Sequence, residues 1–295
     1  KGPKSRFIGC MVGSAVGDAL GASFEGLWIN KLNIEEFSFH GRWTDDTHMM
    51  IGVAESIIAN KGFNGKHMTQ TFIKNWEKEP WRGYGPGPPR VFRMIKSGTE
   101  WNEAAKQLYS GMGSFGNGAA MRVTPIGLFY YDDAERLRET AYKSAEITHT
   151  HILGKEGAAL QAYAVALAVK AEPQNLKSER FLEGLREFAR LNAYKEKLEK
   201  AKFLLGVNDK MEIVKTLGNT VEALNSVVTS IYCFTKYHEN YARAVLYAVS
   251  LGGDADTIGA MTGAIAGAYQ GIENIPSTWI QRLERRNYIC LLYTS

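Results

Sequence analysis

The sequence predicts an all-α fold made of one domain. Apolar residues recur every three or four positions nearly everywhere, as on the buried faces of helices, whereas strand-like alternation is almost absent. Glycine and proline separate these periodic segments. Hydrophobic residues make up 45% of the 295 residues, which is enough to fill a full core. No long linker or low-complexity segment divides the chain, so we expect residues 1–295 to form a single domain.

Helical segments follow one another along the chain. They are expected around residues 7–24, 50–58, 101–109, 134–147, 157–170, 178–188, 221–235, 241–251 and 258–270. The first is the most membrane-like stretch, but Asp18 and several glycines interrupt it, and a spanning helix needs about 20 mostly apolar residues. We therefore expect a buried helix there. Ser178 is the expected N-cap of the helix that ends near residue 188.

Two series of glycines step by four residues along one face of a predicted helix. They are Gly9, Gly13, Gly17 and Gly21 in the first helix, and Gly259, Gly263 and Gly267 in the last. Glycine inside a helix costs roughly 1 kcal/mol relative to alanine. We therefore expect another backbone to approach each of these faces closely, because tight packing would offset that cost.

The charge balance and the cysteine content limit the function classes. A formal net charge of +4 and an isoelectric point near 8.8 suit an anionic ligand. Lysine and arginine are scattered among acidic residues, so nucleic-acid binding is not expected. The three cysteines have no metal-ligand spacing, and their odd number argues against a secreted disulfide framework. We expect an intracellular protein, cytoplasmic or, in a eukaryote, also nuclear, without a signal peptide or a membrane span. The sequence leaves the oligomeric state open, with a monomer favoured.

Two clusters of acidic and hydroxyl side chains stand at the starts of predicted helices. They consist of Thr44, Asp45 and Asp46, and of Asp254, Asp256 and Thr257 after a pair of glycines. Either cluster alone could cap its helix, because threonine and aspartate bind free backbone N–H groups and suit the positive end of the helix dipole. If the helix starts converge, their carboxylates would repel one another strongly without cations. Oxygen-only ligands favour magnesium, manganese or calcium over zinc, so a binuclear cation site is the leading interpretation.

Three residues near these clusters receive separate interpretations. Asp18 lies among apolar and small residues, and we expect it to accept hydrogen bonds from backbone or hydroxyl groups and so fix the core. Glu25 follows that helix on a loop, where its carboxylate could swing over a site and act as general acid or base. His48 is expected to pack behind the ligands rather than to bind a metal.

Two loops are dense in glycine and carry aromatic residues between the glycines. They span residues 81–89 and 111–118, and neither follows a strand, which rules out Rossmann and P-loop phosphate sites. Their backbone amides could still cradle a diphosphate, while Tyr109 or Phe115 could offer a face to adenine. A plain turn is the alternative for either loop.

Two histidines, His149 and His151, stand before an alanine-rich helical run. Residues two positions apart do not share a helix face, so joint metal binding is not expected. A histidine that donates to a phosphate is one interpretation, and a surface or capping histidine is the other.

Four motifs together resemble the ADP-ribosyl-acceptor hydrolase (ADP-ribosylglycohydrolase) family. They are residues 17–21 (Gly-Asp-Ala-Leu-Gly), 44–47 (Thr-Asp-Asp-Thr), 116–122 (Gly-Asn-Gly-Ala-Ala-Met-Arg) and 252–258 (Gly-Gly-Asp-Ala-Asp-Thr-Ile). Their order and spacing match that family over residues 7–276. Residues 82–85, 144–149 and 230–234 look closest to the branch that hydrolyses serine-linked ADP-ribose, poly(ADP-ribose) and O-acetyl-ADP-ribose. The arginine-specific branch, which includes the activating hydrolase of dinitrogenase reductase, shares the acidic motifs.

The resemblance implies a compact, orthogonal multi-helix domain with two magnesium ions, for which manganese is an alternative. By position, it implies that one ion is bound by Thr44, Asp45 and Asp46, the other by Asp254 and Thr257, with Asp256 near both. The sequence departs from the family pattern at Ala255, which lies between ligands.

The resemblance also implies substrate contacts. Glu25 would lie on a mobile flap that gates the site. Our mechanistic hypothesis takes Glu25 as the general acid or base, with Asp46 or a metal-bound water as alternatives. The diphosphate would meet Gly113, Ser114 and His149, the adenine would lie between Tyr109 and Phe115, and further contacts would come from Gly83, Tyr84 and Gly85.

The implied activity is a magnesium-dependent hydrolysis that releases ADP-ribose from modified protein side chains, so ADP-ribose and ADP-ribosylated proteins are the implied partners. Three alternatives stand beside it. They are an arginine-specific hydrolase, a binuclear phosphohydrolase acting on a nucleotide diphosphate, and a non-catalytic relative similar to certain lens crystallins. Both acidic sets are complete and Glu25 is present, which favours an enzyme, because a structural descendant would be free to lose them.

Overall fold

A computed structural model describes residues 2–26 and 39–292. Within these residues every regular element is a helix, and an isolated bridge joins Gly116 to Glu222. The α-helices are α1 (Pro3–Ala22), α2 (Asp45–Asn60), α3 (Gly65–Lys78), α4 (Gly87–Lys96), α5 (Gly118–Met121), α6 (Thr124–Phe129), α7 (Ala134–Ala145), α8 (Ile152–Lys170), α9 (Ser178–Phe188), α10 (Asn192–Phe203), α11 (Lys210–Leu217), α12 (Val227–Lys236), α13 (Tyr241–Ser250), α14 (Ala255–Gln270), α15 (Ser277–Arg282) and α16 (Arg286–Leu291). Short 3-10 helices are η3 (Ala104–Gly111), η4 (Leu204–Gly206), η5 (Ala223–Asn225) and η6 (Ile272–Asn274). The predicted all-α fold is confirmed.

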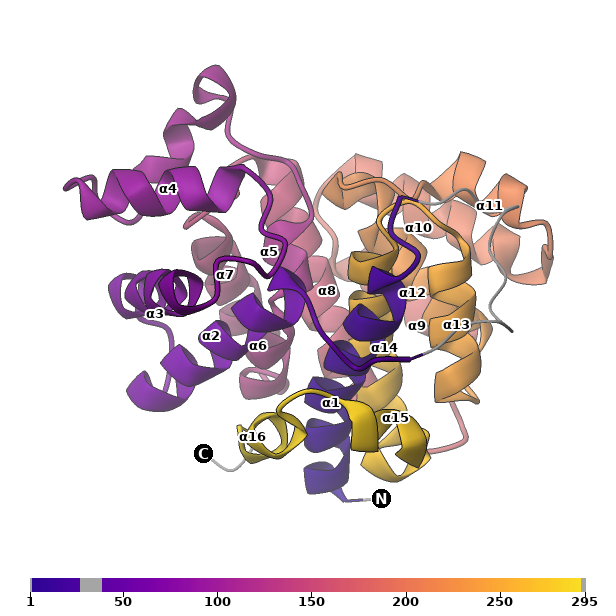
Figure 1. The fold of residues 1–295 in the computed structure, drawn as a ribbon. Helices are drawn as coiled ribbons and strands as arrows, with labels where there is room; N and C mark the ends of the chain where they lie inside the picture. Colours follow the sequence, from indigo (N-terminus) through magenta and orange to yellow (C-terminus); the bar gives the residue numbers. More distant parts are fainter. Residues whose placement is uncertain (1, 27–38, 293–295) are drawn as a thin grey trace.

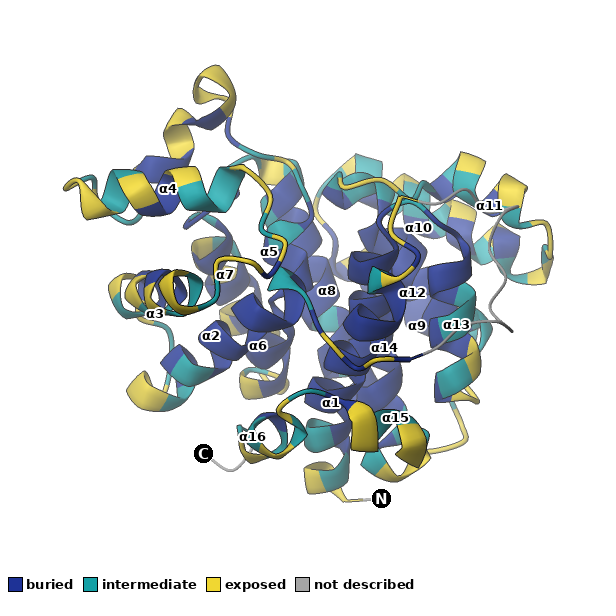
Figure 2. Cartoon of the chain, in the orientation of Figure 1, coloured by how far each residue is buried: buried dark blue, intermediate teal, exposed yellow. Residues whose placement is uncertain are grey.

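Helices α1, α8 and α14 form the centre of the molecule. In Figure 1, α2 to α7 lie on one side of them and α9 to α13 on the other. Figure 2 shows the central helices almost entirely in the colour of buried residues. By length and composition alone, helix α8 could cross a membrane. However, 72% of its most apolar 18-residue stretch is buried inside the protein, as in a core helix.

The two glycine series face each other across the contact between α1 and α14. The helices run in opposite directions, so that Gly9 meets Gly267 and Gly17 meets Gly259. A Cβ atom on Gly17 would lie 2.0 Å from the carbonyl oxygen of Gly259, which no real side chain could tolerate. The predicted close approach of backbones is therefore confirmed, and each series is the surface that the other packs against.

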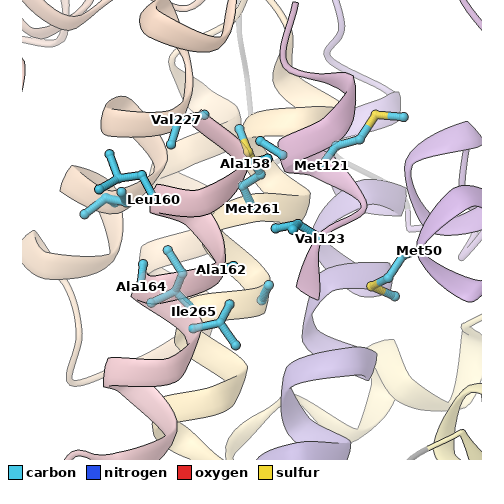
Figure 3. Packing of buried hydrophobic residues seen from close by; sticks show 14 of the residues in the cluster. Met50, Met121, Val123, Ala158, Leu160, Ala162, Ala164, Val227, Met261 and Ile265 are labelled. Carbon is cyan, nitrogen blue, oxygen red and sulfur yellow. The ribbon is translucent and has the colours of Figure 1, made fainter. Parts of the chain in front are cut away.

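One continuous cluster of buried hydrophobic residues runs through the described chain, from Cys10 in α1 to Ile289 in α16. Figure 3 shows part of it, where the small side chains of α8, including Ala158 and Ala162, allow α14 with Ile265 to pack closely. Such a core agrees with a single domain, which stays a prediction.

Several details of the predicted helices were wrong. Lys177, not Ser178, is the N-cap of α9, because the Ser178 hydroxyl instead donates to the carbonyl of Thr235 at 2.8 Å. The segment 101–109 forms the short η3 rather than an α-helix, because its backbone turns extended at Leu108. The helix predicted over 221–235 begins at Val227, because the preceding residues bond to the second glycine-rich loop.

Candidate active site

Two trios of carboxylates lie close together and share Asp256. One oxygen atom each of Asp18, Asp46 and Asp256 lies within 4.8 Å of the other two, and the same holds for Glu25, Asp254 and Asp256. The packing of α1 against α14 brings them together, because it sets the C-terminal end of α1 beside the first turn of α14. The convergence that the sequence left open is therefore present.

Asp18 attaches the start of α2 to α1. Its fully buried carboxylate accepts hydrogen bonds from the backbone N–H groups of Thr44 (2.9 Å) and Thr47 (3.1 Å), and from the hydroxyls of both (2.7 Å each). The predicted structural role of Asp18 is confirmed. Thr44 is also the N-cap of α2, because its side chain accepts from the N–H of Asp46 at 3.3 Å.

Asp254 is placed differently at the start of α14. It occupies the N-cap position, yet its carboxylate makes no capping bond and instead accepts from the amide of Asn117 at 2.8 Å. Gly252 (φ 73°) and Gly253 (φ 61°) precede it in the left-handed region that favours glycine, which gives the sharp turn expected from the sequence. Capping therefore does not account for the second cluster.

Glu25 lies in the turn that follows α1 and is exposed to solvent. The N–H of Gly26 donates to the carbonyl of Gly253 at 2.7 Å, which ties this turn to the second acidic cluster. Partial desolvation, and then the charges of Asp254 and Asp18, raise the pKa of Glu25. The rest of the expected flap, residues 27–38, lies outside the described residues.

The carboxylates of the site repel one another. Burial raises the pKa of Asp18 to about 6, and burial together with the charge of Asp18 raises that of Asp45 to about 8. Burial and the neighbouring aspartates raise the pKa values of Asp46 and Asp256 well above the ordinary range. Crowded carboxylates of this kind hold protons unless cations neutralise them.

The donor set fits hard divalent cations. Asp46 Oδ2 and Asp256 Oδ1 are buried and have no hydrogen-bond partner within the described residues. Thr257, in the first turn of α14, is also buried. Buried oxygen atoms without partners are costly in a protein, whereas they are the ligands that magnesium prefers.

The first glycine-rich loop lies beside the first acidic cluster. The carbonyl of Arg82 accepts from the N–H of Asp45 at 2.8 Å, and Gly83 lies next to the Asp45 carboxylate. The hydroxyl of Tyr84 is 2.7 Å from Nδ1 of His48, and a Cβ on Gly85 would meet no atom within 4 Å. Burial lowers the pKa of His48 to about 4, and its ring stacks on Trp43, so the predicted packing role of His48 is confirmed.

Arg82 and Asn117 were not predicted to matter at the site. The buried Arg82 guanidinium donates to the carboxylates of Glu79 and Glu284 and to the carbonyl of Trp43, at 2.6–3.0 Å, and so holds the residue that precedes Thr44. The available signal was that Arg82 and Asn117 belong to residues 82–85 and 116–122, two of the segments that resemble the family.

The second glycine-rich loop lies beside the second acidic cluster, to which Asn117 connects it. The carbonyl of Phe115 accepts from the N–H of Ala223 at 3.0 Å, and the carbonyl of Ser114 accepts from the N–H of His151 at 3.2 Å. These bonds hold the loop from two sides. The side chains of Tyr109 and Phe115 are 59% and 38% exposed, so both are open to a ligand.

The two histidines have different places. His151 is the N-cap of α8, and its side chain accepts from the N–H of Leu153, so the capping interpretation holds for this residue. His149 is buried against the second glycine-rich loop, where a Cβ on Gly118 would lie 2.4 Å from its ring. Gly113, on the same loop, leaves no room for a side chain beside Thr150.

The sequence model of one protein family, described as ADP-ribosylglycohydrolase, matches residues 1–293. The chain belongs to the ADP-ribosylglycohydrolase family. It is 36% identical to ADP-ribosylhydrolase ARH3 of Gallus gallus, over 96% of this chain and 90% of that protein, and 34% identical to ADP-ribosylhydrolase ARH3 of Homo sapiens, over 95% and 89%.

More distant members of the family are also similar. ADP-ribosylarginine hydrolase Tri1 of Serratia proteamaculans is 25% identical over 95% of this chain and 76% of that protein. A solved structure described as an ADP-ribosylglycohydrolase-related protein complex has a TM-score of 0.79 at 27% identity, over 98% of this chain and 96% of that chain. Similarity to ADP-ribosylhydrolases indicates a hydrolase, and the buried carboxylates of this family member are compatible with a metal site.

Proposed function

We propose that this protein is a magnesium-dependent hydrolase that removes ADP-ribose from modified protein side chains, with the serine-linked form favoured. Poly(ADP-ribose) and O-acetyl-ADP-ribose are further proposed substrates. The observation that carries the proposal is the pair of carboxylate trios that share Asp256 between two glycine-rich loops. An anionic, sugar-containing ligand suits this arrangement, because cations and loop amides can bind it together.

One magnesium ion would be held by Thr44, Asp45 and Asp46 and the other by Asp254 and Thr257, with Asp256 shared. The shared position of Asp256 and the partnerless oxygens of Asp46 and Asp256 support this assignment. When bound, the ions would act as Lewis acids that bind the ribose hydroxyls and stabilise the charge that develops as the acceptor leaves. Asp18 stays behind the ligands, because its carboxylate already accepts four hydrogen bonds.

Glu25 is the proposed general acid or base, with Asp46 as its competitor. Glu25 is the exposed member of the second trio, and its raised pKa brings it closer to neutrality, where a carboxyl exchanges protons most effectively. Asp46 is fully enclosed among other aspartates, which leaves it less free to meet water. As water bonds to the anomeric carbon and the bond to the acceptor breaks, one carboxylate would take the proton of the water and a carboxyl would give a proton to the leaving atom. Glu25 or Asp46 would supply either step.

The two glycine-rich loops would orient the ADP part of the substrate. The proposed diphosphate contacts are Gly113, Ser114 and His149, the proposed adenine contacts are Tyr109 and Phe115, and Gly83, Tyr84 and Gly85 complete the substrate site. The exposure of both aromatic side chains and the position of His149 against the loop support these roles.

Replacing Asp256 with asparagine tests the metal site. We expect Asp256→Asn to lose magnesium-dependent release of ADP-ribose and most of its magnesium affinity in calorimetry, because both trios lose the same charge. Asp132→Asn changes an exposed residue in the same way and should behave as the unchanged protein. Undiminished release by the Asp256 variant would contradict the two-metal proposal.

Chromatography of the products tests the bond and the acceptor. A serine-ADP-ribosylated peptide should yield intact ADP-ribose, whereas a phosphohydrolase would yield AMP. An arginine-ADP-ribosylated peptide, measured beside it, should react more slowly. The identity of 34–36% with proteins named ADP-ribosylhydrolase ARH3, against 25% with an ADP-ribosylarginine hydrolase, supports this order. Faster release from arginine would support the arginine-specific alternative instead, and no release from either would support the non-catalytic one.

A further inference from the structure

A buried arginine stands behind the histidine of the second glycine-rich loop. Arg122 is fully buried, and its guanidinium lies 4.9 Å from the centre of the Phe72 ring. Its Nη2 donates to the carbonyl of Ser144 at 2.7 Å, and its Nη1 donates to the hydroxyl of Thr148 at 2.6 Å. Among the described residues no carboxylate is hydrogen-bonded to it. Burial lowers its pKa to about 9, so Arg122 still carries its charge at neutral pH.

One hydrogen-bond acceptor is available to the proton of the Thr148 hydroxyl. The oxygen atom accepts from Arg122, which can only donate, and it also lies 2.6 Å from Nδ1 of His149. The hydroxyl has a single proton, and in the described part of the chain no acceptor other than this ring nitrogen is hydrogen-bonded to it. Donation from Thr148 to Nδ1 of His149 is the arrangement that gives this buried proton an acceptor, and it makes Nδ1 the unprotonated nitrogen of the ring.

The proton of the imidazole is consequently on Nε2. Burial, followed by the charge of Arg122, lowers the pKa of His149 to about 3, so the ring is neutral and carries one N–H group. Nε2 faces the loop, because a Cβ on Gly118 would lie 2.7 Å from it and one on Gly116 would lie 3.5 Å from it. No described residue is hydrogen-bonded to Nε2, which leaves this donor for a ligand.

We propose that Arg122 and Thr148 are positioning residues that fix His149 as its Nε2–H tautomer, so that His149 donates a hydrogen bond to an anionic diphosphate in the loop of residues 113–118. The ligand in this statement rests on the proposed function, whereas the tautomer does not. Arg122 is too deeply buried to touch the ligand, so its charge acts through the orientation of the Thr148 hydroxyl. The result is a donor of fixed direction instead of a ring that could turn an acceptor toward an anion.

Nitrogen-15 NMR of the histidine side chains tests the tautomer in the unchanged protein. The two-bond proton–nitrogen correlations distinguish a protonated ring nitrogen from an unprotonated one, and His149→Gln identifies the signals among the six histidines. We expect a protonated Nε2 and an unprotonated Nδ1 at neutral pH without any ligand. A protonated Nδ1 would overturn the proposal, and this result does not depend on an activity.

Two substitutions at Thr148 test the relay, by which we mean the hydrogen bonds from Arg122 to the Thr148 hydroxyl and from that hydroxyl to Nδ1 of His149. Thr148→Val keeps the branched shape but removes the hydroxyl, and Thr148→Ser keeps the hydroxyl. We expect the valine variant to populate both tautomers and to bind ADP-ribose about tenfold more weakly, which corresponds to one lost hydrogen bond to a charged group. The serine variant should retain the tautomer and the affinity. An unchanged tautomer in the valine variant would show that Thr148 does not set it.

Different results would refute the proposed ligand and the proposed relay. If ADP-ribose binds but the His149 signals do not move, the hydrogen bond to the diphosphate is refuted while the proposed function stands. If ADP-ribose does not bind at all, the proposed function fails, and the ligand-free spectra still decide whether Arg122 and Thr148 fix the tautomer.

Discussion

Replacing Gly17 with alanine should separate the two helices that build the active site. Gly17 lies where α1 crosses α14, and a Cβ on it would be 2.0 Å from the carbonyl oxygen and 2.6 Å from the carbonyl carbon of Gly259. Both contacts are with backbone, which cannot rotate away as a flexible side chain can. Restoring an ordinary contact of 3.4 Å requires the backbones to move apart by about 1.4 Å.

The size of the effect follows from two opposing contributions. Alanine is the better helix former by about 1 kcal/mol, which favours the variant. Forcing extra volume into a packed interface costs about 1–3 kcal/mol, including the backbone shifts that follow. A displacement of about 1.4 Å along a central helix pair lies at the upper end, so we expect a net loss of about 2 kcal/mol or more in the free energy of unfolding.

Chemical denaturation, with Gly184→Ala as the matched control, measures this effect. Gly184 is inside α9, and its added Cβ would meet its nearest neighbour, Leu167 Cδ1, at an ordinary 3.6 Å. The control should therefore become more stable by about 0.5–1 kcal/mol. Gly17→Ala should also hydrolyse its substrate more slowly, because Asp18 follows Gly17 and would move away from Asp256. Equal stability of the two variants would refute the reasoning.

Two further predictions concern buried titratable groups. Asp18→Asn replaces an oxygen that accepts a hydrogen bond with an amide group that donates one, so the Thr44 hydroxyl must turn its proton toward Asp46 and Asp256. We expect the magnesium affinity to fall at least tenfold in calorimetry. An unchanged affinity would contradict the role of Asp18 in orienting Thr44. His149 has a folded pKa of about 3, below the ordinary value of about 6.5, so between these values the unfolded chain binds the extra proton and stability falls as the pH falls. Between pH 7 and 4.5 His149→Gln should therefore lose about 2.5 kcal/mol less stability than the unchanged protein in denaturant titrations, and equal losses would count against a neutral buried ring.

The local chemistry of the site could be read from the sequence. A carboxylate or hydroxyl at a helix start is visible as a pattern, and so is an aspartate among small apolar residues. Asp18 accepts backbone and hydroxyl hydrogen bonds as predicted, and His48 packs behind the site as predicted. The boundaries were less accurate wherever a distant segment competed for the backbone. Residues before Val227, for example, bond to the loop that contains Phe115 instead of extending α12.

The partners of polar side chains could not be read from the sequence. Arg82 and Glu284 are separated by 202 positions, and Asn117 and Asp254 by 137, so no local pattern connects them. The relay from Arg122 through Thr148 to His149 is similar, because its first step spans 26 positions although its second joins neighbours. Directional hydrogen bonds of this kind depend on atomic positions that only the packed core defines.

By itself the sequence determined the all-α class, the two oxygen-rich helix starts and the glycine faces, because periodicity and residue chemistry are local properties. The tertiary structure decided that the two glycine faces pack against each other, in a register that pairs Gly17 with Gly259. That register places Asp18 and Asp256 within 4.8 Å and gives both carboxylate trios a common member. Register is a collective result of close packing along two helices, since a shift by one residue would bring a Cβ against backbone at every crossing point.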